Sequence, residues 1–167
     1  GKAAEQIKGV VKVIQLPIGV AVCAKTTDAA LKGREALELK WDQGTLPDMN
    51  TQFVEKSLME DLDKPGATVL NTGDAKKTLG EASKRLEATY YVPCVAHMTM
   101  EPMNCTADVK ADRCEIWAPT QNLTASKGLA SKVSGVPIEK VQVNNTFLGC
   151  GLGRRAKPDF VAQAVMV

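Results

Sequence analysis

The feature that most limits how this chain can fold is the stretch of residues 43–74, where residues that break helices and strands recur every few positions. These residues are Gly44, Pro47, Asp48, Asn50, Pro65, Gly66, Asn71 and Gly73. Prolines and glycines at this density interrupt regular secondary structure, and only residues 51–62 have the apolar spacing of an amphipathic helix. We therefore expect residues 44–73 to connect two folded parts of the chain.

The residues before this connector predict a small unit of strands and one helix. Residues 10–14 and 18–23 are short β-branched runs, which is typical of two neighbouring strands. Thr27 is placed to cap the helix that follows them. Residues 37–41 alternate apolar and charged side chains, and this alternation predicts a third strand.

The residues after the connector predict a second unit of strands and helices. The expected strands are residues 84–92, 105–109, 114–117 and 141–147, of which the middle two form a hairpin. Asn122 is placed to cap a helix that ends near Ser134, and another helix is expected to begin at Pro158. This order of elements favours an α+β fold, with mixed sheets and helices packed on one face.

The composition excludes several classes of function. The 21 basic and 19 acidic residues leave a formal net charge of +2, and aromatic residues make up 4% of the chain. This balance supplies neither the basic surface nor the stacking platforms of nucleic-acid-binding proteins, so we expect no nucleic-acid partner. No run of residues reaches the roughly 18 apolar positions that a membrane-spanning helix needs, so we expect no span in this chain.

The single histidine, His97, limits the metal sites that the chain can build by itself. Sites that require two or more histidine ligands are excluded. His97 and the nearby Glu101 could form an acid–base pair, although Pro102 favours a turn with a hydrogen-bonded histidine. The five cysteines include no Cys-x-x-Cys pair, and their odd number predicts unpaired thiols.

We expect the chain to be a piece of a longer protein. It opens with Gly1-Lys2-Ala3 rather than a natural start, and residues 159–167 stop within an apolar run that has no polar tail. A site formed by these residues would then be only part of a complete site.

Two short motifs carry residues that could bind a ligand. Residues 149–155, Gly-Cys-Gly-Leu-Gly-Arg-Arg, follow a predicted strand; the glycines let backbone amides approach an anion or a polar cofactor, and the arginines could clamp phosphate or carboxylate. Residues 119–122 end another strand, and Gln121 could donate its side-chain N–H to a ligand oxygen. Taken singly, each motif is better explained by a structural role: residues 149–155 as a glycine turn, and residues 119–122 as a turn that caps a helix.

Five segments together resemble a known family. They are residues 88–93 (Ala-Thr-Tyr-Tyr-Val-Pro), 97–107, 115–122, 135–141 and 147–155. Their order resembles the large, molybdenum-binding subunit of the xanthine oxidase family of molybdenum hydroxylases. The branch it most resembles is that of the isoquinoline 1-oxidoreductase beta-subunit and related aldehyde dehydrogenases, because Gly-Arg-Arg at residues 153–155 replaces the Gly-Gly-Lys of the xanthine dehydrogenase branch. Residues 2–42 resemble the closing half of the family's α/β hammerhead domain.

The resemblance implies a domain division and a cofactor site. Residues 1–43 would be the C-terminal half of an α/β hammerhead-like domain, 44–73 a connector, and 74–167 the N-terminal part of the molybdopterin-binding domain. The cofactor-binding residues would be Gln121, Gly151, Leu152, Gly153 and Arg154. In the family, the glutamine side chain and the loop amides touch the oxo and sulfido ligands of molybdenum. The implied cofactor is molybdenum-molybdopterin cytosine dinucleotide.

The resemblance also implies an activity. The whole protein would hydroxylate an N-heterocycle or oxidise an aldehyde with water as the oxygen source, with a small-molecule substrate and an iron–sulfur small subunit that carries [2Fe–2S] clusters. No catalytic residue is expected here, because the family's general base is a glutamate far beyond these segments. The implied location is the periplasm after folded export, with the cytoplasm as the alternative.

Two positions depart from the family pattern. Cys150 and Leu152 stand where the family commonly has Gly and Phe, which affects the substrate side of the loop. The alternative function is a non-catalytic homologue, or a standalone module that binds a nucleotide or an anion through the glycine loop.

Overall fold

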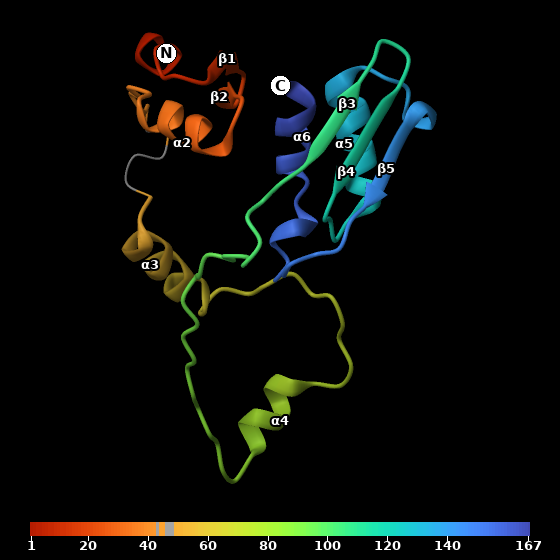
Figure 1. Ribbon diagram of the computed structural model, residues 1–167. Coiled ribbons are helices and arrows are strands. Elements are labelled where there is room, and N and C mark those ends of the chain that lie inside the picture. Colours follow the sequence, from red (N-terminus) through yellow and green to blue (C-terminus); the bar gives the residue numbers. More distant parts are fainter. Residues whose placement is uncertain (43, 46–48) are drawn as a thin grey trace. The chain divides into compact units, whose positions relative to one another are not determined.

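The computed structural model describes residues 1–42, 44–45 and 49–167 (Figure 1). Contacts divide them into one compact unit of Gly1–Glu38 and Cys94–Val167 and a second of Leu39–Pro93. The second unit contains the described part of the expected connector and extends beyond it in both directions, whereas Gln43, Pro47 and Asp48 lie outside the described residues. The assignment of residues 1–43, 44–73 and 74–167 to domains stays a prediction.

The N-terminal residues form a two-stranded antiparallel sheet with two helices. Strand β1 (Val10–Leu16) pairs with β2 (Gly19–Ala24), which confirms both expected strands. Helices α1 (Lys2–Glu5) and α2 (Thr27–Glu35) pack against them, and α1 was not expected from the sequence.

Close packing explains a glycine in the interior of α2. A Cβ atom at Gly33 would lie 2.7 Å from Val22 Cγ1 and 2.9 Å from Val10 Cγ2, so the helix approaches the sheet only with glycine there. The cap of this helix is one residue earlier than expected: the Thr26 hydroxyl, rather than that of Thr27, accepts a hydrogen bond from the Ala29 amide at 3.2 Å.

Two of the strand predictions are wrong. Residues 37–41 and 84–92 form no helix or strand. An alternating pattern becomes a strand only when a neighbouring strand accepts its backbone hydrogen bonds, and none of the described strands pairs with either segment. The regular elements of this part of the chain are α3 (Thr51–Asp61), which confirms the expected helix, and α4 (Ala75–Glu81), which was not expected although Asp74 caps it locally.

The C-terminal residues form a three-stranded mixed sheet in the order β3–β4–β5. Strand β3 (Thr106–Val109) is antiparallel to β4 (Cys114–Ala118), as the expected hairpin requires, and β4 is parallel to β5 (Val141–Asn145). Helix α5 (Leu123–Ser134) connects the parallel strands, and α6 (Asp159–Met166) follows β5 through a loop. Asn122 caps α5 as expected, by accepting a hydrogen bond from the Ala125 amide at 3.0 Å.

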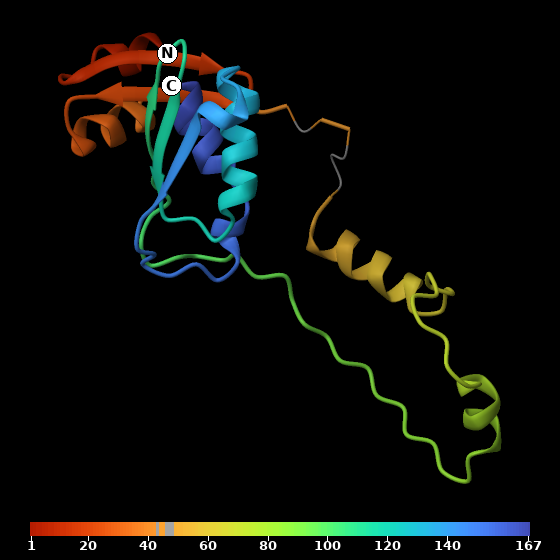
Figure 2. The ribbon, with the colours of Figure 1, turned by 90° about the vertical axis from the view of Figure 1, so that its right-hand side faces the viewer.

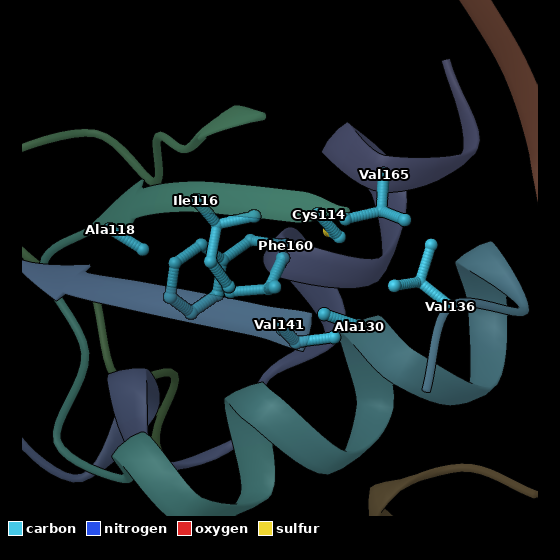
Figure 3. Packing of buried hydrophobic residues seen from close by; sticks show 9 residues of the cluster. Cys114, Ile116, Ala118, Ala130, Val136, Val141, Phe160 and Val165 are labelled. Atoms are coloured by element: carbon cyan, nitrogen blue, oxygen red, sulfur yellow. The ribbon is translucent and has the colours of Figure 1, made fainter. Parts of the chain in front are cut away.

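One apolar core lies between this sheet and its two helices. Cys114, Ile116 and Ala118 alternate along β4 and are all buried, so their side chains share one face of the sheet. Phe160 of α6 and Ala130 of α5 pack against that face (Figure 3). Figure 2 shows both helices beside the same side of the sheet, which confirms the α+β fold with helices on one face.

None of the helices in the described part of the chain has the length and apolar character that a bilayer crossing requires.

The cysteines differ in exposure, and this difference predicts their reactivity. All five are unpaired; Cys94 is exposed and Cys114 is buried. Burial raises the pKa of the Cys105 thiol to about 11, and it also raises the pKa of Cys114. Because the thiolate is the reactive form, we expect a thiol reagent at mildly alkaline pH to modify Cys94 first and Cys105 and Cys114 only after unfolding.

Titration after denaturation without reductant should find about five thiols in the 167-residue chain. A single reactive thiol would show two disulfides and contradict this expectation.

Candidate functional site

The two sequence motifs meet at one edge of the three-stranded sheet. We call residues 119–122 the glutamine turn and residues 149–155 the glycine loop. The turn follows β4 and the loop follows β5, and because these strands are parallel their carboxyl ends lie at the same edge. There the Gly153 amide donates a hydrogen bond to Gln121 Oε1 at 3.1 Å, and the Gln121 amide donates one to the Arg155 carbonyl oxygen at 3.2 Å.

Hydrogen bonds of backbone amides and a buried hydroxyl hold the glutamine turn against the sheet and helix α5. The Thr120 amide donates to Asn145 Oδ1 at 3.1 Å, and the Thr146 amide donates to the Ala118 carbonyl oxygen at 3.3 Å. The Thr120 side chain is only 2% exposed, and its hydroxyl lies 3.0 Å from Ser126 Oγ at the start of α5. The backbone of the turn is therefore held from both the sheet and the helix.

The hydrogen bond to Gly153 orients the Gln121 side chain. Of the two polar atoms of the side-chain amide, only the carbonyl oxygen can accept a hydrogen bond from an N–H, so Oε1 faces the Gly153 amide. No acceptor among the described residues lies within hydrogen-bonding distance of Nε2, and the side chain is exposed. The Nε2 hydrogens of Gln121 therefore have no acceptor among the described residues, and cofactor binding by Gln121 stays a prediction.

The glycine loop has an unusual backbone. Cys150, Leu152 and Gly153 have φ values of 89°, 51° and 85°, in the left-handed region that favours glycine. For the two residues with side chains, this conformation costs on the order of 1–3 kcal/mol each. Within the described part of the chain, no group accepts a hydrogen bond from the backbone amides of Cys150, Gly151 or Leu152. Successive N–H groups on alternating backbone conformations are typical of concave sites for anions and oxygen atoms.

Arg155 is the buried centre of the site. Its side chain has no exposed surface, and its Nε donates to the Cys150 carbonyl oxygen at 2.9 Å. Its Nη2 donates to the Glu101 carbonyl oxygen at 2.8 Å and to Glu101 Oε2 at 3.0 Å, and Nη1 donates to the Pro119 carbonyl oxygen at 3.4 Å. The sequence suggested that this arginine could clamp a ligand, but its burial makes it a structural group instead.

Arg154 also has a partner within the chain. Its two terminal nitrogens donate to the carboxylate of Asp159 at 2.9 and 3.0 Å, with the side chains 34% and 30% exposed. Burial alone would raise the pKa of Asp159, but hydrogen bonds from Arg154, its charge and the Phe160 amide outweigh burial and hold that pKa below its usual value. Cofactor binding by Arg154 stays a prediction, and it would compete with this ion pair.

Glu101 contacts the glycine loop rather than His97. Its carboxylate accepts hydrogen bonds from the Gly149 amide at 2.7 Å, from Asn104 Nδ2 at 2.8 Å and from Arg155. The Gly149 amide, with help from Asn104, lowers the pKa of Glu101. His97 is exposed. Sequence reasoning missed the contact between Glu101 and Arg155, because residues 54 positions apart share no local pattern.

Within residues 1–42, 44–45 and 49–167, no three His, Cys, Asp or Glu side chains gather into a group that could hold a metal ion.

Comparison with known proteins assigns the chain to a family. Residues 60–167 match the sequence model of the molybdopterin cofactor-binding domain. The chain belongs to this family. The match confirms the resemblance to the molybdenum-binding subunits of the xanthine oxidase family that the five motifs predicted.

Three relatives cover nearly the whole chain. It is 28% identical over 96% of its length to a subunit of nicotinate dehydrogenase of Pseudomonas putida. It is 29% identical over 99% of its length to the beta subunit of isoquinoline 1-oxidoreductase of Brevundimonas diminuta. It is 27% identical over 98% of its length to a membrane-bound aldehyde dehydrogenase (pyrroloquinoline-quinone) of Gluconacetobacter polyoxogenes. The chain spans 14% of the first of these proteins and 22% of each of the other two.

A pair of glycine substitutions tests the contact between loop and turn. A Cβ atom at Gly151 would lie 2.6 Å from Gln121 Oε1, whereas one at Gly153 would meet nothing within 4 Å. We expect Gly151→Ala to displace Gln121, with a loss of about 1 kcal/mol for the broken hydrogen bond. Hydrogen exchange at the Gly153 amide should accelerate at least about fivefold.

Gly153→Ala is the matched control. It should lower stability through its φ of 85° and leave the Gln121 side chain in place. Unchanged exchange at residue 153 in Gly151→Ala would show that Gln121 does not contact the loop.

The Arg154–Asp159 pair predicts a pH dependence. Because the folded pKa of Asp159 lies below its usual value of 3.8, its stabilising effect is present above that value and disappears as the pH falls through the lowered pKa. Asp159→Asn should therefore destabilise the protein at neutral pH by about 0.5–1 kcal/mol, since the pair is partly exposed. The difference from wild type should vanish in strong acid.

Denaturant unfolding over a pH series measures this effect. Asp112→Asn, on the exposed turn between β3 and β4, serves as the control and should show no difference at any pH. A pH-independent difference for Asp159→Asn would contradict a charge-based role.

Proposed function

We propose that this chain contributes part of the cofactor site of a molybdenum hydroxylase that hydroxylates an N-heterocycle or oxidises an aldehyde, with water as the oxygen source. The observation that carries the proposal is the meeting of Gln121 and the glycine loop at the carboxyl edge of β4 and β5. These are the two segments whose residues the family resemblance assigns to the cofactor. The membership of residues 60–167 in the molybdopterin cofactor-binding family supports it.

The chemistry of the exposed groups suits such a cofactor. Gln121 Nε2 and the amides of residues 150–152 are hydrogen-bond donors without a described protein acceptor. The ligands and phosphates of a molybdenum–pterin cofactor are oxygen and sulfur acceptors, so donors without competing acceptors favour its binding. When bound, the cofactor supplies the two-electron oxidation, while the protein supplies binding and orientation.

Each residue has a distinct proposed role. Gln121 donates its side-chain N–H to an oxygen of the cofactor, and the amides of Gly151 and Leu152 donate from the loop. The Leu152 side chain is 59% exposed beside these amides and would form part of the wall toward the substrate. The Gly153 amide donates a hydrogen bond to Gln121 Oε1, so Gly153 would act mainly by holding that side chain in place.

The names of the relatives support the substrate class. Two of them specify N-heterocycles, nicotinate and isoquinoline, and the third specifies an aldehyde. Two are named as subunits, which agrees with a partner subunit. The cytosine dinucleotide form of the cofactor, [2Fe–2S] clusters on a small subunit and a periplasmic location are parts of the same proposal and follow from the family resemblance alone.

The alternative, a standalone nucleotide- or anion-binding module, has less support from the contacts. Such a site would be expected to use the arginines of the loop. Arg155 is fully buried, and Arg154 is bound by the carboxylate of Asp159. We therefore favour the cofactor-binding function.

The test is metal and nucleotide analysis of the intact protein that contains this chain, isolated from a host that makes the cofactor. Molybdenum and CMP in amounts near one per protein are expected. A protein that carries neither, while its loop binds free nucleotide, would favour the alternative.

Gln121→Ala tests the residue-level role. It deletes a hydrogen bond worth about 1–3 kcal/mol, so turnover per bound molybdenum should fall roughly 5- to 150-fold. Gln142→Ala is the matched control, because this exposed glutamine of β5 contacts Asn144 and not the loop. Wild-type turnover in both variants would contradict the role of Gln121.

A further inference from the structure

One carboxylate holds both ends of the glycine loop. Glu101 accepts a hydrogen bond from the amide of Gly149, where the loop begins, at 2.7 Å. The same oxygen, Oε2, accepts from the guanidinium of Arg155, where the loop ends, at 3.0 Å. We propose that Glu101 is a positioning residue, which together with Arg155 holds the loop in the conformation that leaves the amides of residues 150–152 open to a ligand.

The contact between Glu101 and the start of the loop is reciprocal and close. The Glu101 amide donates to the Gly149 carbonyl oxygen at 3.0 Å while the Gly149 amide donates to the Glu101 carboxylate. A Cβ atom at Gly149 would lie 2.6 Å from the Cβ of Glu101. The two backbones therefore approach as closely as they do because residue 149 has no side chain.

The contact with the end of the loop depends on charge. The Arg155 side chain has no exposed surface, and Glu101 is the carboxylate within ion-pair distance of it. A buried cation is stable only when its charge and its donors are matched, so removal of the carboxylate leaves Arg155 with carbonyl oxygens alone. The guanidinium would then move toward water, and the segments of Cys150 and Pro119 that it binds would lose their common anchor.

The hydrogen bonds of Glu101 are those of a structural group. Both carboxylate oxygens already receive hydrogen bonds, Oε1 from Asn104 and Oε2 from Gly149 and Arg155. We therefore assign Glu101 the role of holding the glycine loop through Gly149 and Arg155.

Hydrogen exchange in the metal-free intact protein tests the proposal directly. The amides of Gly153 and Arg154 are the useful reporters, because they donate to Gln121 Oε1 and to the Gly151 carbonyl oxygen and do not touch Glu101. In Glu101→Gln we expect their exchange to accelerate at least tenfold. A purely local role would change exchange at Gly149 alone and would overturn the proposal.

The matched control is Glu115→Gln. Glu115 lies on β4, accepts one hydrogen bond from Asn144 Nδ2 at 3.1 Å and does not contact the loop. Exchange at Gly153 and Arg154 should be the same as in the wild type. An acceleration equal to that in Glu101→Gln would show a general effect of lost charge and overturn the proposal.

A second variant covers the case in which Glu101→Gln does not fold. Glu101→Gln combined with Arg155→Met buries no unpaired charge, and such replacements often preserve folding. We expect slow exchange in β4 and α6 to be retained while Gly153 and Arg154 again exchange at least tenfold faster. Wild-type exchange at these two amides in a folded double variant would overturn the proposal.

The inference rests on the proposed function only for the identity of the ligand, and the outcomes separate the two. A loosened loop in Glu101→Gln, in a protein whose wild type binds no molybdenum, would support the positioning role and reject the proposed function. Normal molybdenum content with an unchanged loop in Glu101→Gln would reject the positioning role and leave the function intact.

Discussion

The buried guanidinium of Arg155 is the interaction on which the rest of the site depends. Because it has no contact with water, all of its donors must be matched by protein acceptors. Those acceptors come from Glu101, Pro119 and Cys150, which lie on three segments far apart in the sequence. The hydrogen bonds of this one guanidinium therefore hold three segments together at the same edge of the sheet.

The sheet and its core determine where these segments can meet. Parallel β4 and β5 direct the glutamine turn and the glycine loop to one edge, and α5 occupies the connection between the strands. Helix α6 begins a few residues after the loop, and its Phe160 and Val161 are buried in the same apolar core as Ile116 of β4. The apolar core thus anchors the chain a few residues after Arg155, and the loop is short enough to be held at both ends.

The site that results is rich in donors and poor in free charge. Glu101 forms an ion pair with Arg155, and Asp159 forms one with Arg154. The groups that remain open to a ligand are the side-chain amide of Gln121 and the backbone amides of the loop. A neutral set of donors suits the orientation of a large polar cofactor that brings its own reactive centre. Cys150 and Leu152, which stand where the family resemblance implies Gly and Phe, adopt left-handed backbone conformations in spite of their cost.

Signals that are local in the sequence determined much of this fold. The capping residues Asn50 and Asn122, the left-handed Gly135 at the end of α5 and the turn between β3 and β4 act within a few residues, so the elements beside them could be predicted. The ordered motifs also determined the family and the two segments of the candidate site.

Only the tertiary structure decided which elements find partners and what the charged residues do. Residues 37–41 and 84–92 have strand patterns, yet a strand also needs a neighbour, and no described strand pairs with them. Arg155 looks like a ligand-binding arginine in the sequence but is buried against Glu101, 54 residues away. No periodic pattern records a contact over that separation, because it arises only when the core brings the two segments to the same edge of the sheet.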